Sequence, residues 1–175
     1  MAVLDIITIP DPLLKTVSAP VETVDDDVRR LVADMLETMY EAPGIGLAGV
    51  QVGVARRLLV ADTVKDDDAP RAPIAMINPQ ILWRSDEVSS YEEGCLSIPD
   101  VYAEVERPKQ VRVSFVDDQG QAQELLCDGL LATVIQHELD HLDGLLFVDH
   151  LSRLKRDRLI KKFLKNQRDG SDVVA

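Results

Sequence analysis

Apolar residues recur every three or four positions in three segments of the chain, which is the spacing of one face of an α-helix. The first segment covers residues 25–44, where acidic residues can cap the start and a Pro-Gly pair ends the pattern. The second covers residues 130–142, and the third runs from about 152 to 167. In this last predicted helix four apolar residues are expected to face inward, namely Leu154, Ile160, Phe163 and Leu164.

Other segments have the pattern of β-strands. Residues 56–62 and 74–83 are expected to be extended, with Pro79 marking an edge or a bulge. In residues 110–129 apolar and polar side chains alternate, and the D-Q-G sequence at 118–120 makes a turn, which predicts a hairpin. The helices and strands together predict an α+β fold.

The length and composition indicate one domain, residues 1–175. With 46% apolar and 29% charged residues, the chain is typical of a soluble protein that buries a core without disulfide bonds. No apolar run approaches the roughly 20 residues that span a bilayer, and the N-terminus lacks the basic region of a signal peptide. We therefore expect a cytoplasmic protein with no membrane partner, in which Cys95 and Cys127 stay reduced.

Charge is distributed unevenly along the chain. The segment 151–168 has eight basic residues and one acid, Asp157, and so carries +7. Because the whole chain carries −12, the remainder carries −19. This distribution of charge is not typical of a general nucleic-acid-binding protein. It indicates one basic segment on an otherwise acidic protein.

An H-E-x-x-H motif lies inside the second predicted helix, at His137, Glu138 and His141. Four residues advance a helix by about 400°, so the two imidazoles lie about 40° apart in azimuth and one turn apart along the axis. Both rings can therefore bind one metal ion, with Glu138 beside a metal-bound water as the general base. A surface helix with two solvated histidines is the alternative interpretation.

The third ligand decides the class of site. Metzincin proteases need a histidine where this chain has Phe147, and thermolysin-like enzymes need a later glutamate, whereas the chain has no Glu after Glu138. The third ligand must therefore lie upstream or be an aspartate. The acids close by are Asp140, Asp143 and Asp149, and their spacing singles out none of them.

Cys95, in the sequence E-E-G-C-L-S-I-P-D, is an upstream candidate, because a thiolate can bind a metal closely. A free cysteine is nevertheless most often a small buried apolar residue. A structural zinc site that adds Cys127 to Cys95 and both histidines is a further alternative. It lacks the short C-x(2–4)-C spacing that such sites usually have.

The third candidate stretch is the glycine-containing loop G-I-G-L-A-G-V-Q-V-G, residues 44–53. Its glycines allow close backbone approach, and the Gln51 amide can donate to an oxyanion. The loop lacks the G-x-G-x-x-G order and precedes a strand, which argues against a dinucleotide site. A turn without chemistry is the alternative.

Taken together, G-I-G-L-A-G-V-Q, E-G-C-L-S-I-P and Q-H-E-L-D-H resemble in order and spacing the motifs of peptide deformylases. The resemblance extends from I-I-T-I-P-D-P-L-L near the start to D-H-L-S-R-L-K-R. That family removes the formyl group from the N-terminal methionine of newly made bacterial and organellar proteins. The resemblance implies antiparallel sheets packed around a central helix with the H-E-x-x-H motif, plus an N-terminal helix and a C-terminal amphipathic helix.

The resemblance also implies the roles of individual residues. The metal ligands would be Cys95, His137 and His141, with a water in the fourth position, and Glu138 would be the general base and acid. Nascent formylated polypeptides would be the substrates, and formate a product. The remaining roles are oxyanion stabilisation by Gln51 and the Leu96 backbone N–H, substrate-backbone binding by Gly46, and a methionine pocket formed by Ile45, Leu130, Thr133 and Val134.

Fe(II) is the usual metal of the family, and Zn, Ni or Co can replace it in purified protein, since thiolate and imidazole accept all four. One departure from the family pattern is Gly49, where G-x-G-L-A-A-x-Q has alanine, and we expect the missing methyl to widen that corner slightly. Some relatives carry Arg in place of Tyr102, so no role is assigned to that residue.

The basic C-terminal helix, about residues 152–168, has two interpretations. It can be a solvated amphipathic helix, or it can bind ribosomal RNA near the tunnel exit, as the resemblance to bacterial deformylases suggests. Its charge of +7 on an acidic body motivates the second hypothesis. Residues 169–175 are expected to form a disordered tail.

Overall fold

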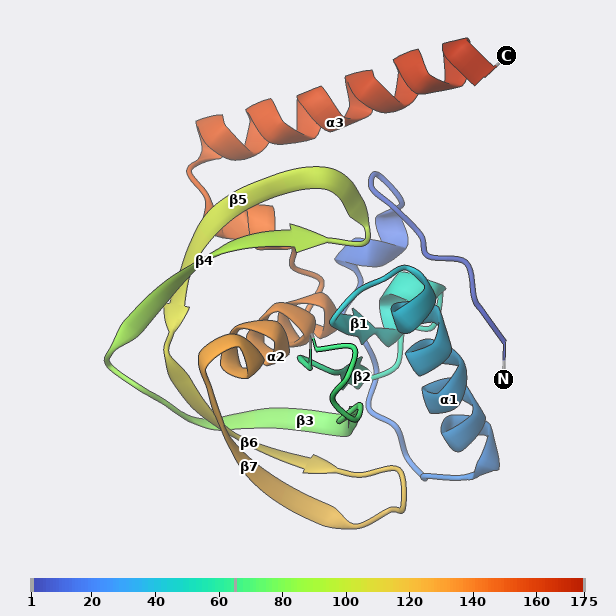
Figure 1. Cartoon of the computed structure of the whole chain (residues 1–175), viewed down its shortest axis with the longest axis vertical. Coiled ribbons are helices and arrows are strands. Elements are labelled where there is room, and N and C mark those ends of the chain that lie inside the picture. The colour runs from blue at the N-terminus through green and yellow to red at the C-terminus, as the bar shows by residue number, and fades with distance from the viewer. Residues whose placement is uncertain (1, 65, 175) are drawn as a thin grey trace.

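The structure is a computed structural model that describes residues 2–64 and 66–174, with side chains described up to residue 169 (Figure 1). Within these residues the elements follow one another in the order η1 (Pro12–Lys15), α1 (Asp26–Glu41), β1 (Gly46–Ala48), η2 (Gly49–Val52), β2 (Leu58–Ala61), β3 (Ile74–Arg84), β4 (Val88–Cys95), β5 (Ile98–Pro108), β6 (Gln110–Val116), β7 (Ala122–Asp128), α2 (Gly129–Leu142), η3 (Phe147–His150) and α3 (Arg153–Val174).

The strands form two antiparallel sheets. One has five strands in the order β1-β2-β3-β6-β7, and the other is the β4-β5 hairpin. Figure 1 shows α2 lying between the two sheets, with α1 beside β1 and β2 and with α3 outside β5. The expected α+β fold, with antiparallel sheets around a central helix, is confirmed.

Helix α1 begins where the sequence predicts it. The Asp25 carboxylate accepts a hydrogen bond from the Val28 N–H at 2.9 Å, which satisfies one of the free amides of the first turn. The buried face then packs on β2 and β3 through residues that recur at helical spacing. The buried apolar residues are Val28, Val32, Met35 and Met39.

The expected irregularity at Pro79 is a β-bulge in β3. The register with β6 shifts between Ile77 and Gln80, and Asn78 has a positive φ of 52°. The Asn78 side chain donates to the Val21 carbonyl and accepts from the Val21 N–H, both at 2.8 Å. These bonds hold the bulge against the segment that precedes α1. The hairpin predicted in residues 110–129 is formed by β6 and β7, with Gly120 at φ 79° in its turn.

The β4-β5 hairpin was not predicted. Its signal in the sequence is an alternation along β5, where Val101, Ala103 and Val105 are buried and the residues between them are exposed. The hairpin ends in a tight turn in which Cys95 pairs with Ile98. The turn therefore presents Cys95 and the next residues towards α2.

Helix α3 differs from the prediction in its buried face and in its length. Phe163 is buried and Ile160 is half-buried in a cluster with β5 and η3, but Leu154 is 72% exposed and Leu164 is 38% exposed. The expectation that Leu154 and Leu164 face inward is therefore wrong. Periodicity predicts which residues share a face, whereas burial also requires another element to cover that part of the helix.

The C-terminal helix also continues beyond its expected end. α3 extends to Val174, so most of the segment 169–175, expected to be a disordered tail, is helical. Gly170 lowers helix propensity by about 1 kcal/mol, which by itself does not end a helix. Among the described residues, no helix has the length and apolar character needed to span a membrane.

Candidate metal centre and active site

The structure brings together one cysteine and two histidines. His137 and His141 lie one turn apart on α2, with ring centroids 5.1 Å apart, and Cys95 reaches them from the end of β4. The candidate ligand atoms of these three residues all lie within 4.8 Å of one another. The Cys95 Sγ is 3.3 Å from the His141 Nε2. One thiolate and two imidazoles converging in this way fit a single divalent ion with a further position left for solvent.

The other residues considered as ligands have different partners. The Asp143 carboxylate pairs with Arg57, and the Asp149 carboxylate accepts from the Leu146 N–H. Phe147, at the position of the last metzincin histidine, stacks on His137 with ring centroids 5.9 Å apart. The Phe147 ring therefore packs against His137, one of the candidate ligands.

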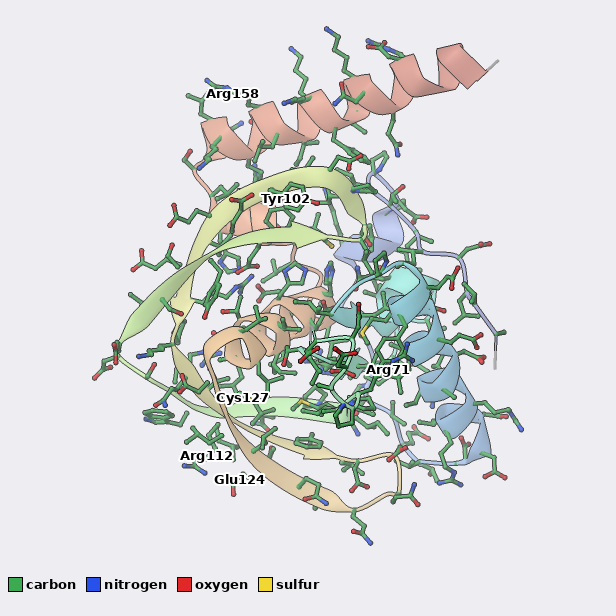
Figure 2. The ribbon with its side chains drawn as sticks, in the orientation of Figure 1. Arg71, Tyr102, Arg112, Glu124, Cys127 and Arg158 are labelled. Carbon is green, nitrogen blue, oxygen red and sulfur yellow. The ribbon has the colours of Figure 1, made fainter. Side chains whose placement is uncertain are left out.

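Cys127, labelled in Figure 2, lies in the apolar core and is not part of this group. Burial raises the pKa of its thiol to about 11, so the thiolate that zinc requires is disfavoured. The alternative of a four-ligand structural zinc site is therefore not supported by the structure.

The two imidazoles have different environments in the metal-free chain. Burial would lower the pKa of His137, but hydrogen bonds with Cys95 and Glu93 outweigh it and raise that pKa well above its ordinary value. Burial, with added repulsion from His137 and Arg107, lowers the pKa of His141 well below its ordinary value. Metal binding is therefore expected to release a proton from His137, because an imidazole ligand must be neutral.

Glu138 is a buried carboxylate at the floor of the site. Its side chain is only 5% exposed, and Oε1 lies 3.9 Å from the His137 Nε2. Burial raises the pKa of Glu138 to about 7, although the charge of His137 acts in the opposite direction. Among the described residues, Glu138 Oε2 and His141 Nδ1 are buried without a hydrogen-bond partner. A buried acceptor of this kind, next to the candidate ligands, fits a site that holds a metal ion and water.

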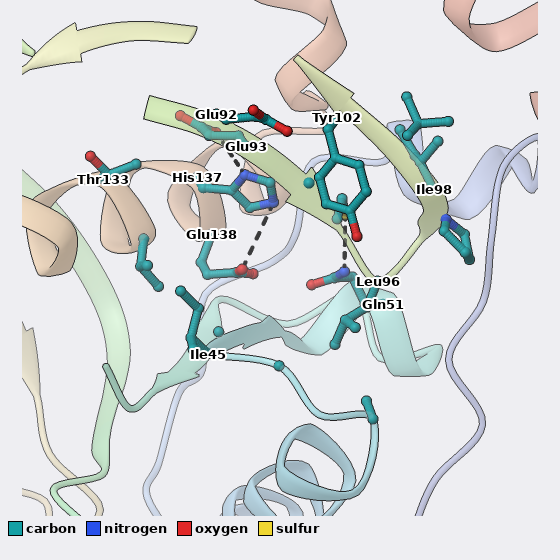
Figure 3. A pocket seen from close by; sticks show the side chains of 18 of the residues that line it. Ile45, Gln51, Glu92, Glu93, Leu96, Ile98, Tyr102, Thr133, His137 and Glu138 are labelled. Carbon is teal, nitrogen blue, oxygen red and sulfur yellow. Dashed lines mark hydrogen bonds and ion pairs between the residues drawn. The ribbon is translucent and has the colours of Figure 1, made fainter. Parts of the chain in front are cut away.

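Gln51 is held beside Cys95 by its own amide. Its Oε1 accepts from the Ala48 N–H at 2.9 Å, so its Nε2 points to the Ser97 Oγ at 3.1 Å and to the Cys95 Sγ at 3.5 Å. Figure 3 shows Gln51 and Leu96 close together at one side of the cavity, with His137 and Glu138 at the other. Gln51 is 1% exposed, so this donor is fixed before a ligand arrives.

A cavity of about 750 Å³ opens in front of these groups. The structure places ten of the predicted site residues in its wall: Ile45, Gly46, Gln51, Cys95, Leu96, Leu130, Thr133, Val134, His137 and Glu138. His141, the remaining predicted ligand, is fully buried behind them.

Two glycines allow a close approach of the backbone to neighbouring segments, and one of them, Gly46, lines this cavity. A Cβ on Gly46 would lie 2.8 Å from both Glu138 Oε1 and Val134 Cγ1, so only glycine lets β1 approach α2 this closely. A Cβ on Gly49 would lie 2.9 Å from the Val54 carbonyl oxygen. The expected widening at Gly49 is therefore wrong, because the backbone of the following loop takes up the space of the missing methyl.

A second layer of charged residues, which sequence reasoning missed, supports the ligands. The Glu93 carboxylate lies 2.9 Å from the His137 Nδ1 and receives two hydrogen bonds from Arg107, at 2.7 and 3.0 Å. Burial would raise the pKa of Glu93, but the bonds from His137 and Arg107 outweigh it and lower that pKa. An ionised Glu93 fixes the His137 tautomer so that Nε2 is free for a metal.

Comparison with known proteins identifies the family of this chain. The family model described as polypeptide deformylase matches residues 3–157. A peptide deformylase of Methylocella silvestris is 60% identical over 91% of this chain and 83% of its own length, and one of Rhizobium meliloti is 56% identical over 94% of both.

Solved structures of related proteins have the same fold. A peptide deformylase from Ehrlichia chaffeensis superposes with a TM-score of 0.91 at 40% identity, over 97% of this chain and 99% of its own. The same protein in complex with actinonin gives a TM-score of 0.90 at 42% identity, over 96% and 99% of the two chains. From the fold, the site and these similarities together, we conclude that the chain belongs to the polypeptide deformylase family of enzymes.

Proposed function

We propose that this enzyme removes, by hydrolysis, the formyl group of the N-terminal formyl-methionine of nascent polypeptides and releases it as formate. The observation that carries the proposal is the convergence of Cys95, His137 and His141 beside a buried carboxylate and a fixed amide donor. A divalent ion held by these three residues would act as a Lewis acid and lower the pKa of a water to about 7.

Glu138 is proposed as the general base and then the general acid. Burial raises the pKa of its carboxyl to about 7 in the metal-free chain, which favours uptake of a proton more than in an exposed glutamate. It would take a proton from the attacking water and deliver it to the leaving amine of methionine.

Gln51 and the backbone N–H of Leu96 are proposed to stabilise the oxyanion that forms on the formyl carbon. The Gln51 Nε2 is already oriented by the bond between its Oε1 and the Ala48 N–H. A donor fixed in this way does not reorganise during the reaction, and one such donor is typically worth about 3 kcal/mol.

The methionine side chain is proposed to enter the apolar part of the cavity, between β1 and α2. Ile45, Leu130 and Val134 would provide apolar contacts there, and Thr133 also lines the cavity. Gly46 belongs to β1, which is the edge strand of the five-stranded sheet. The free edge of β1 can therefore pair with an extended substrate backbone.

The physiological metal is proposed to be Fe(II), in keeping with the family resemblance stated above. A Cys-His-His set also accepts Zn, Ni and Co, so the metal in purified protein depends on handling. Metal analysis after anaerobic purification, paired with a formate assay, tests this assignment. Activity that follows zinc content and is insensitive to oxygen would contradict it.

Incubation with two peptides tests the activity itself. We expect formate to be released from formyl-Met-Ala peptides, while an unformylated longer peptide stays intact. Cleavage of internal bonds without formate release would instead support a metalloendopeptidase that uses the same helix.

The basic helix is proposed to bind ribosomal RNA near the tunnel exit, in the cytoplasm where nascent chains emerge. The described basic side chains of α3 are exposed or half-exposed, and Figure 2 shows Arg158 on the side of α3 that faces away from the body. Deleting residues 153–175 is expected to lower ribosome affinity and its salt dependence. Unchanged affinity and salt dependence would contradict this proposal.

A further inference from the structure

A chain of hydrogen bonds leads from the candidate metal site to the surface on the other side of α2. It begins with His137 Nδ1 and Glu93 and continues to Arg107. The Arg107 Nη1 then donates to the Asp140 Oδ2 at 2.8 Å. The His150 Nε2 lies 2.7 Å from the same Asp140 oxygen, so this ring can donate to it from η3.

Burial decreases along this chain towards the solvent. The side chains of Glu93 and Arg107 are each 5% exposed, that of Asp140 is 19% exposed and that of His150 is 38% exposed. The buried guanidinium makes two bonds to Glu93, which fix it along one edge. Asp140 binds the remaining terminal nitrogen and so fixes the orientation of Arg107 from the opposite direction.

We propose that Asp140 is a positioning residue for His137, acting through Arg107 and Glu93, and that His150 holds Asp140 in place. The proposal rests on the proposed function in one respect, which is that the Cys-His-His group binds a divalent metal. The new element is that the affinity for this metal depends on Asp140, whose carboxylate points away from the metal site.

The physical reason is that Arg107 and His137 compete for hydrogen bonds to the Glu93 carboxylate. Arg107 is shared between Glu93 and Asp140, so each carboxylate carries part of the interaction with the guanidinium. Without the charge of Asp140, Arg107 would interact more strongly with Glu93, which would then be a weaker acceptor for the His137 Nδ1–H. The imidazole would become less basic and less firmly oriented, and both changes weaken metal binding.

A purely structural ion pair would behave differently. Buried ion pairs often contribute little net stability, and their loss would change the unfolding temperature without changing the geometry at the metal. Metal affinity and the spectrum of a bound metal therefore separate the two roles.

The test compares Asp140→Asn, in α2, with Asp143→Asn, at the C-cap of the same helix. Asp143 is a matched control, because its side chain is 54% exposed and pairs with Arg57, outside this chain of bonds. Zn affinity is measured by competition with a chelator, and the visible spectrum of the Co(II)-loaded protein reports ligand geometry. We expect Asp140→Asn to weaken Zn binding by about tenfold and to alter the Co(II) spectrum, and Asp143→Asn to change neither.

His150 provides a second comparison that does not depend on how Asp140→Asn folds. His150→Ala removes the donor to Asp140 at a partly exposed position, and we expect a smaller loss of Zn affinity in the same direction. His150→Gln keeps an N–H donor and is expected to retain the affinity of the parent protein.

A folded Asp140→Asn protein with the Zn affinity and Co(II) spectrum of the parent would overturn the proposal. If Asp140→Asn does not fold, equal Zn affinity in His150→Ala and in the parent would overturn it. The proposed function fails by a different observation, which is the absence of formate release by the metal-loaded parent protein.

Discussion

Helices α2 and α3 bury different kinds of residue. Ten of the fourteen residues of α2 are buried, and they include His137, Glu138 and His141. In α3, Phe163 is the one buried side chain among those described. α2 therefore places polar groups inside the molecule, whereas α3 contacts the body mainly through one aromatic residue and its half-buried neighbours.

This difference shows what apolar periodicity measures. The same spacing predicted both helices, but it did not distinguish a helix enclosed between two sheets from one that lies outside them. Burying a carboxylate and two imidazoles lowers stability unless other groups compensate. We therefore expect substitutions in α2 to change catalytic activity and metal binding, and substitutions in α3 to leave both unchanged.

Glu138→Gln should have the largest effect. The amide keeps the shape of the side chain but cannot accept a proton, so we expect kcat to fall by about 10²- to 10⁴-fold. Formate release at saturating formyl-Met-Ala peptide measures this, with metal content determined in the same samples. Asp157→Asn in α3 serves as the control and should leave kcat unchanged. A Glu138→Gln enzyme with near-normal kcat would assign the base role to another group.

Phe163→Ala should separate stability from activity. Removing a buried phenylalanine costs about 3 kcal/mol, so the free energy of unfolding should fall by that amount while kcat under folded conditions is retained. Leu154→Ala, at a residue that is 72% exposed, should stay within about 0.5 kcal/mol of the parent. Urea unfolding of the parent protein and of the two variants measures both changes in the free energy of unfolding. Equal losses in the two variants would show that α3 packs through both residues.

Glu138→Gln should also stabilise the metal-free protein above neutral pH. The folded-state pKa is raised from 4.5 to about 7, so ionising Glu138 increasingly disfavours the folded state between these pH values and by a constant amount above them. The amide does not ionise, and we expect a gain of at most about 3 kcal/mol at pH 8 that disappears near pH 4.5. Urea unfolding at several pH values measures the gain. A constant difference across this range would exclude the ionisation as its cause.

Asp157→Asn should have the smallest effect. Asp157 lies 3.9 Å from Arg153 and 3.5 Å from Arg156, and its side chain is 58% exposed. Surface ion pairs of this kind contribute about 0–1 kcal/mol and are screened by salt. We expect the free energy of unfolding to change by less than about 0.5 kcal/mol. A larger change that persists at high salt would indicate that this face of α3 is packed.

The sequence predicted the parts of the molecule that depend on local patterns. Residue spacing along α1 and α2 indicates which side of each helix is apolar, and the turn residues at 118–120 indicate the β6-β7 hairpin. The H-E-x-x-H spacing places two imidazoles one turn apart by helix geometry alone. The choice of Cys95 as their partner needed the family resemblance, because nothing local distinguishes it from a buried apolar cysteine.

The residues that were missed act through contacts between distant segments. Arg107 lies on β5, and its partners Glu93 and Asp140 lie on β4 and α2. An arginine is expected to face solvent because of its charge, although Arg107 continues the buried series of alternating residues along β5. The strand pattern alone does not show which acidic partners it meets. In α3, likewise, burial of a leucine depends on whether another element packs over that part of the helix.

The close approach of β1 to α2 at Gly46 has a consequence for inhibitors. Any larger residue there would push against both the Glu138 carboxylate and the Val134 side chain. A compound that binds the main chain at this position would therefore meet a part of the target that cannot change without harming the enzyme. Resistance substitutions are expected elsewhere along the cavity, where side chains instead of backbone form the contact.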